Sequence, residues 1–220
     1  MHTSLSRMRP LIVLGMIALA ACQPTDKNQA PTGVVAKAMD EAAKGLGEAS
    51  QEMDKAREEI ATARDRLARE NISLNRNEKQ HLPKAEITPA GDLLIEGKAV
   101  ATTPEQKALV LAYRGELLGV VGDGMAIGME GARVGIDAAA SALKGVLAGQ
   151  DGDQIGKQVG EQAKAKIQPM VAQLCTRLPG LLSAQQALSA ALPEFAPYAT
   201  MDQADVDDCG DAYGDGNWTF

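Results

Sequence analysis

The chain has 220 residues, a formal net charge of −7 at pH 7 and only 3% aromatic residues. Its basic residues are interspersed with acidic ones and form no Lys/Arg-rich run, which excludes a nucleic-acid-binding surface. The length suffices for one domain, but with so few aromatic side chains its core is expected to be thin and closely packed.

The first 21 residues have the pattern of an export signal. Arg7 and Arg9 precede an apolar run at residues 11–21, which is too short to cross a bilayer as a permanent helix. The run ends in Leu19-Ala20-Ala21-Cys22, which resembles the lipobox of bacterial lipoproteins, so we predict cleavage before Cys22 and acylation of its thiol. The alternative is an ordinary signal-peptide cut that leaves an incidental free thiol.

Residues 22–32 are polar, contain two prolines and show no apolar periodicity, which is typical of a flexible tether. In the lipoproteins that this start resembles, an aspartate directly after the acylated cysteine retains the protein at the inner membrane, whereas residue 23 here is Gln23. The resemblance therefore implies the periplasmic face of the bacterial outer membrane, with the lipid as the link to the membrane.

Between Val35 and Leu67, apolar residues recur at alternating spacings of four and three, which is a heptad pattern. The pattern predicts one long helix that ends in the polar segment 71–77, before Pro83. Alanine at every d position would let a second helix approach closely. The a-position residues are Met39, Leu46, Met53, Ile60 and Leu67, and the d-position residues are Ala42, Ala49, Ala56 and Ala63.

Three short β-prone stretches follow, separated by turn-forming Pro-Ala-Gly and Glu-Gly segments, and they predict a small β-meander at about residues 85–101. Strands this short are not stable alone. Their apolar face, formed by Ile87, Leu93 and Ile95, is therefore expected to rest on a helix.

A strong helix start comes next, with Thr103 as N-cap, Pro104 at the first helical position and Gln106 able to bond back to the cap. The predicted helix runs to about residue 148 and contains a row of small residues. Because a glycine inside a helix costs stability unless close packing compensates, we expect this row to lie against another helix. The row comprises Gly124, Gly128, Gly131, Gly135, Ala138, Ala142, Gly145 and Gly149.

Two arrangements of the heptad helix follow from these rows. In the one that we favour, its alanines pack within one chain against the small-residue row of residues 124–149, as an antiparallel hairpin. In the other, it self-associates in parallel, and Glu52 and Glu59 would face Arg57 and Arg64 of a second copy. Charged residues within the glycine row disfavour a membrane-spanning helix there.

The remaining predicted elements are a third helix at about residues 153–178, ended by Pro179-Gly180, and a short fourth helix between the capping box Ser183-x-x-Gln186 and Pro193. Residues 195–220 are acidic, rich in aromatic residues and without periodicity. The sequence thus predicts a mainly α fold of long antiparallel helices, with a helical domain at residues 33–194 and a C-terminal segment at residues 195–220.

Cys175 and Cys209 are the cysteines that remain beside Cys22. In the oxidising periplasm they are expected to form a disulfide, which stabilises the fold by about 3 to 4 kcal/mol in the chain-entropy model. The alternative, two free thiols or a metal-binding pair, is disfavoured because no histidine lies near either residue in the sequence.

The sequence lacks the residue patterns of common catalytic and metal sites. His81 is the single histidine after the signal segment, and no zinc-protease, serine-hydrolase or phosphate-binding motif occurs. The acidic residues around 211–216 resemble a calcium loop but lack its bidentate glutamate. We therefore expect no enzyme activity, no cofactor and no metal.

One stretch, from Ile87 to Lys98, together with the helix start at residues 103–106, resembles the YggN-like family of uncharacterised periplasmic proteins. The likeness covers residues 84–180 and includes Cys175, which is similar to a cysteine late in the family's helical part. The chain departs from the family by its lipobox, its heptad helix and Cys209 as the expected disulfide partner. The resemblance implies an exported, helical, non-catalytic protein.

Two functions of different class fit these features. The favoured one is a structural or protein-interaction role in the cell envelope, in which the heptad helix binds a protein partner or a second copy. The alternative is a module that binds an apolar ligand such as a lipid, near Met125, Met129, Ile136 and the C-terminal aromatic residues.

Overall fold

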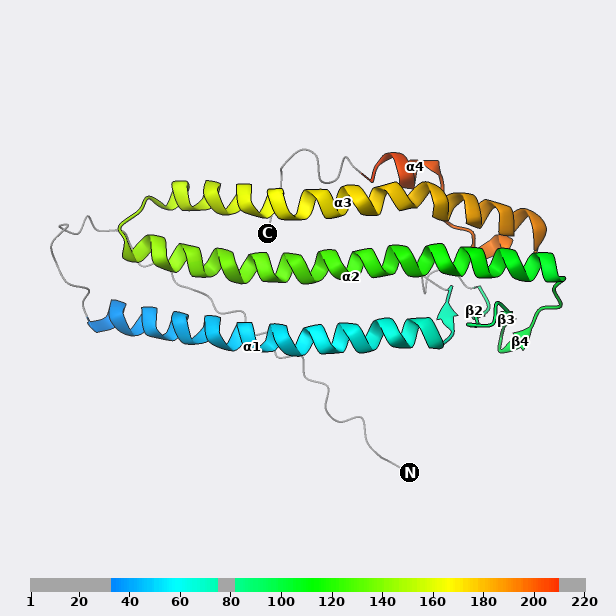
Figure 1. The fold of residues 1–220 in the computed structure, drawn as a ribbon, viewed down its shortest axis with the longest axis horizontal. Helices are drawn as coiled ribbons and strands as arrows, with labels where there is room; N and C mark the ends of the chain where they lie inside the picture. The colour runs from blue at the N-terminus through cyan, green and yellow to red at the C-terminus, as the bar shows by residue number, and fades with distance from the viewer. Residues whose placement is uncertain (1–32, 75–81, 210–220) are drawn as a thin grey trace, which may run out of the picture.

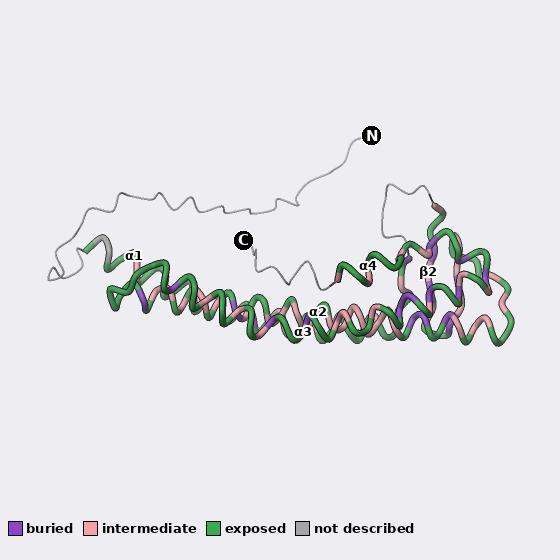
Figure 2. Tube along the Cα trace, turned by 90° about the horizontal axis from the view of Figure 1, so that it is seen from above, coloured by how far each residue is buried: buried purple, intermediate pink, exposed green. Residues whose placement is uncertain are grey.

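The computed structural model describes residues 33–74 and 82–209. Three long helices lie side by side, namely α1 (Gly33–Arg69), α2 (Pro104–Leu147) and α3 (Gly152–Ala191) (Figure 1). The middle helix, α2, runs antiparallel to both neighbours and separates them. Seen from above, the three helices form a thin band, one helix thick, along most of their length (Figure 2). The mainly α fold of long antiparallel helices is confirmed.

The β-meander is a four-stranded antiparallel sheet in the order β1-β2-β3-β4. Its strands are β1 (Ile72–Ser73), β2 (Ala85–Ile87), β3 (Leu93–Ile95) and β4 (Lys98–Ala99). Ile87 pairs with Leu93 on one side and with Ile72 on the other. The predicted meander is therefore present and has one strand, β1, more than expected.

The core lies at one end of the helical layer, where the sheet covers the start of α2 and the end of α3. Buried residues are concentrated there in Figure 2. As expected, the apolar face of the sheet rests on helices, because Ile87 and Leu93 are fully buried in the same cluster as residues of α2 and α3. That cluster consists of Leu74, Ala85, Ile87, Leu93, Val110, Tyr113, Leu181, Leu188, Leu192, Phe195 and Tyr198.

Residues just beyond 194, where the helical domain is predicted to end, also belong to the core. Phe195 is fully buried, and its ring meets that of Tyr113 edge to face at 5.1 Å. Tyr198, at the end of a short 3-10 helix (Ala196–Tyr198), is buried and donates a hydrogen bond from its hydroxyl to the carbonyl of Pro83 at 2.8 Å. Phe195 and Tyr198 therefore hold this segment in the core. The segment has no apolar periodicity, so their burial could not be predicted from the sequence pattern.

The break predicted at Pro179-Gly180 and the capping box at Ser183 are wrong, since α3 continues to Ala191 with both Pro169 and Pro179 inside it. A proline within a helix costs about 3 kcal/mol. Beyond Pro179, the helix buries Leu181, Leu182 and Leu188. Each buried leucine contributes about 1.5 to 3 kcal/mol, so packing outweighs the loss of one backbone hydrogen bond.

Candidate functional site

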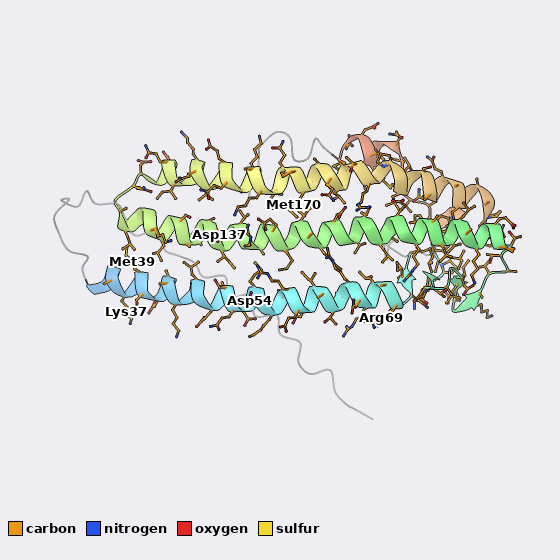
Figure 3. All side chains as sticks on the ribbon, viewed as in Figure 1. Lys37, Met39, Asp54, Arg69, Asp137 and Met170 are labelled. Carbon is orange, nitrogen blue, oxygen red and sulfur yellow. A yellow bond between two sulfur atoms is a disulfide. The ribbon has the colours of Figure 1, made fainter. Side chains whose placement is uncertain are left out.

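Helix α1 packs on α2 through its heptad seam. Met53 is buried with 8% exposure, and Ile60 is half-buried. The alanines at positions 49, 56 and 63 are half-buried, whereas Ala42 is exposed. Figure 3 shows Met39 on the side of α1 toward α2 and Lys37 on the opposite side. The structure thus has the antiparallel hairpin across the sheet, while parallel self-association stays a prediction.

The predicted close packing is wrong for four glycines of the small-residue row. Gly124, Gly128, Gly131 and Gly135 are all exposed, and a Cβ atom added at any of them would meet nothing within 4 Å. The reason is the rotation of α2 about its axis, which directs its larger side chains, Met125 and Met129 among them, toward α1. Met125 and Met129, and not the four glycines, therefore lie beside Ile60 and Ala61 of α1.

One member of the row does pack closely. A Cβ atom at Gly145 would lie 2.8 Å from Cγ1 of Ile155, which is buried on α3. Gly149, in the turn between α2 and α3, has a φ of 69°, a conformation that favours glycine. The glycines at this end therefore serve the α2–α3 connection and not the contact with α1.

A groove of about 540 Å³ lies between α1 and α2, with one wall from α3. Its apolar lining includes three methionines, one of which, Met170, lies on the side of α3 toward α2 (Figure 3). We call this hollow the methionine groove. Its apolar residues are Ile60, Ala61, Met125, Ala126, Met129 and Met170, and its charged residues are Arg57, Arg64, Asp65, Glu130 and Arg133.

Charged residues in and beside the methionine groove pair within α2 and with one lysine of α3. Glu130 accepts hydrogen bonds from Nε and Nη2 of Arg133 at 2.9 and 2.5 Å. Arg133 also donates to Asp137 at 3.3 Å, and Lys166 of α3 donates to the same carboxylate at 3.5 Å. The Arg133 hydrogen bond, followed by the charges of Arg133, Lys166 and Arg57, lowers the pKa of Glu130 below its ordinary value of 4.5.

Two side chains tie neighbouring helices together beside this network. Nη2 of Arg64, on α1, donates to the carbonyl of Gly122 on α2 at 2.6 Å. Arg177, on α3, donates through Nε to the carboxylate of Asp123 on α2. These polar bonds add to the packing of methionine and alanine where the helical layer is thin, because buried apolar area is scarce there.

Arg114 is a structurally central residue that the sequence analysis missed. It has 4% exposure, and its guanidinium donates to the carbonyls of Leu67, Ala68 and Glu70 at the end of α1, and to that of Ile87 in β2. The last carbonyls of a helix lack partners within it and carry partial negative charge. Arg114 thereby joins α1, the sheet and α2. No pattern in the sequence around Arg114 distinguishes it from the other arginines.

The chain after α3 is fixed in three ways. The structure joins Cys175 and Cys209 in a disulfide with Cα atoms 5.7 Å apart, which is the pair expected from the sequence. Buried Gln185 donates to the carbonyl of Met201 at 2.8 Å and accepts from the Met201 amide at 3.1 Å. Helix α4 (Gln203–Asp207) is capped by Asp202 and lies against α3. The disulfide therefore links to α3 a segment that other contacts already hold against this helix.

The predicted export signal and Cys22 with its tether lie outside the described residues, as do His81 and the acidic residues around 211–216. Within residues 33–74 and 82–209, no group of three or more His, Cys, Asp or Glu side chains is placed to hold a metal ion. In the same part of the chain, no helix has the length and apolar character needed to cross a bilayer.

Comparison of the chain with protein-family models, with curated proteins and with solved structures finds no match. The resemblance to the YggN-like family accordingly stays a prediction that rests on residues 84–180 alone.

Proposed function

We propose that this chain is a lipid-anchored protein of the bacterial outer membrane, on its periplasmic face, with a non-catalytic structural or protein-interaction role. The observation that supports it best is the shape of the molecule. The core occupies one end, and from there a layer one helix thick extends with both faces open to solvent (Figure 2). Helix α1 alone has 37 residues, which corresponds to a length of about 55 Å.

A shape of this kind suits the display of surface more than the enclosure of a substrate. Enzyme sites are concave and bury most of a small ligand, with reactive groups held in place by packing around them. In the described part of the chain, Glu130 and Arg133 of the methionine groove pair with each other, and Arg133 also pairs with Asp137. The lowered pKa of Glu130 follows mainly from its hydrogen bond with Arg133.

The outer side of α1 fits a solvated or partner-facing surface. Its charges form pairs one turn apart, such as Lys55 with Glu52 at 2.6 Å and Arg69 with Asp65 at 2.9 Å. Exposed pairs of this type contribute little to stability. They leave a long polar face without strong net charge, which is available for contact with another envelope component.

The anchor is tested by labelling cells with radioactive palmitate and separating inner from outer membranes. We expect label in the wild-type protein in the outer-membrane fraction and none in a Cys22→Ser variant, which would be released in soluble form. Gln23→Asp is the matched control, since it keeps the acylated cysteine and should move the protein to the inner membrane. Absence of label from the wild type would refute the anchor.

The interaction role is tested by crosslinking in intact cells through photoreactive residues placed at exposed Lys44 or Glu48 on α1. We expect a discrete adduct of reproducible mass, either with another envelope protein or with a second copy of the chain. Only unmodified monomer at both positions, and at equivalent positions on the exposed side of α3, would refute an interaction role.

The methionine groove supports a second candidate function, the binding of an apolar ligand. Of the residues expected near such a ligand, Met125 and Met129 line the groove and Ile136 does not. The aromatic residues Phe195 and Tyr198 belong to the core. Native mass spectrometry of the folded domain after gentle purification tests this function. Bound lipid mass that disappears in Met129→Glu, but persists in Met201→Glu as a control outside the groove, would support it. A ligand-free wild-type mass would refute it.

A further inference from the structure

Large apolar side chains with high exposure are few among the described residues. Val146 has 58% exposure, Leu147 has 61%, and Leu111 has 43%. Val146 and Leu147 are adjacent in the last turn of α2, whereas Leu111 lies near the other end of that helix. We call the pair Val146 and Leu147 the exposed tip.

The exposed tip belongs to a well-ordered connection. The amide of Gln150 donates to the carbonyl of Gly145 at 2.9 Å, and Asp151 caps α3 by accepting from the amide of Asp153 at 2.9 Å. Ile155 is buried against Gly145 immediately behind the turn. The connection thus has an apolar contact of its own between Ile155 and Gly145 on its inner side. Val146 and Leu147 lie on its outer side, exposed to solvent.

The exposed tip lies at the end of the layer where α1 begins, opposite the core (Figure 1). Only ten residues, 23–32, separate the lipobox cysteine from Gly33 at the start of α1. A chain of this length cannot exceed about 40 Å even when fully extended. An acyl group on Cys22 therefore keeps the tip end within reach of the bilayer, and the core end lies about 55 Å from the tip end along α1.

We propose that the exposed tip is a membrane-contact site, at which Val146 and Leu147 enter the interface of the bilayer that holds the acylated Cys22. This inference rests on the proposed lipid anchor. Lys144, in the same last turn, can extend its ammonium group to lipid phosphates while its methylene stem lies along the tip. Asp151 and Asp153 flank the turn on the α3 side, so the site suits zwitterionic lipid better than a strongly anionic surface.

The contact sets the orientation of the whole molecule. A chain held only by its tether can lie flat on the membrane or turn freely. A second, weak contact at the tip favours an upright layer, because tether and tip lie at the same end. The sheet and the core are then presented to the periplasm, away from the lipid.

The test uses the acylated chain in vesicles of phosphatidylcholine and phosphatidylethanolamine whose acyl chains carry bromine as a quencher. An environment-sensitive fluorophore is attached to Gln150→Cys beside the tip or to Lys98→Cys at the far end of the molecule. Bromine should quench the fluorophore at residue 150 at least threefold more than the one at residue 98. Equal quenching at both residues, with the protein still bound to vesicles, would overturn the tip contact and leave the anchor intact.

A second comparison distinguishes contact of the exposed tip with lipid from mere proximity of residue 150 to the bilayer. Val146→Ser with Leu147→Ser should lower quenching at residue 150 at least threefold, whereas Leu111→Ser, the matched exposed leucine at the other end, should leave it unchanged. Quenching that persists in the double variant overturns the proposal. So does a concentration-dependent dimer of the unacylated chain that the double variant abolishes, because the tip would then bind a second copy. A wild-type mass without acyl groups refutes the anchor and the tip contact together.

Discussion

Nη2 of Arg114 lies 2.7 Å from the carbonyl oxygen of Leu67, and this hydrogen bond joins α2, the middle helix, to the end of α1 across 47 residues of sequence. The other partners of the guanidinium are also neutral carbonyls. Burial lowers the pKa of Arg114, although an arginine stays charged in proteins. The partial negative charge of the α1 C-terminus is therefore its main electrostatic counterpart.

Replacement of this arginine tests its role. Arg114→Met keeps much of the side-chain volume but leaves the α1 carbonyls without a donor, so we expect the free energy of unfolding to fall by about 2 to 4 kcal/mol. Urea denaturation followed by circular dichroism measures the change. Arg66→Met, at an exposed position on α1, is the control and should change stability by less than about 0.5 kcal/mol. Equal effects of the two variants would contradict the assigned role.

The exposed glycines predict stabilisation by substitution. Since a Cβ atom at Gly124, Gly128, Gly131 or Gly135 meets nothing within 4 Å, each change to alanine should raise the free energy of unfolding by about 0.5 to 1 kcal/mol. Gly145→Ala should instead destabilise, because its Cβ atom would collide with Ile155. Thermal unfolding of the five single variants checks both signs. Destabilisation by the first four substitutions would indicate that these glycines are closely packed and would contradict the structure.

The disulfide predicts a redox-dependent stability. Reduction of Cys175–Cys209 removes a closure across a sequence separation of 34 residues, which should cost about 3 to 4 kcal/mol in the chain-entropy model. Urea denaturation with and without a reductant measures this difference. The double variant Cys175→Ser with Cys209→Ser serves as control, and its stability should not respond to reductant. A wild-type protein that is equally stable in both conditions would contradict a structural disulfide.

Glu130 predicts a dependence of stability on acid pH. Its folded pKa lies below its ordinary value of 4.5, mainly because of the Arg133 hydrogen bond, so the ionised form favours folding. That contribution is complete well above pH 4.5 and disappears as the pH falls through the folded pKa. Glu130→Gln should therefore be less stable than the wild type at pH 7, with a smaller difference at pH 3. A difference that does not vary with pH would contradict the pairing.

Patterns of local origin allowed much of the architecture to be predicted. The heptad spacing of residues 35–67 predicts α1, and the capping box of Thr103 and Gln106 is present with both of its hydrogen bonds. The apolar face of Ile87 and Leu93 is buried as expected. Each of these signals depends on neighbours within a few residues, so a single sequence contains the information.

Features that depend on distant neighbours could not be predicted in this way. Pro179 is a helix breaker by local rules, and only the burial of leucines beyond it keeps α3 intact. The orientation of the glycine row depends on how α2 rotates between two other helices. Arg114 and Phe195 bind partners far away in sequence, and neither is distinguished by its immediate surroundings. The methionine groove could be predicted only in part, because Met170 comes from a third helix.

Because the core lies at one end of the molecule, the end near the sheet is held by many more buried contacts than the opposite end. Amide protons near Leu188 should exchange only when the whole protein unfolds, whereas those near Ile155 can exchange through partial opening of the thin layer. A pull applied at Gly33, away from the core, runs along the axis of α1. At the core end of α1, the hydrogen bonds of Arg114 to the last carbonyls add to the packing of α1 on α2 in resisting such a pull.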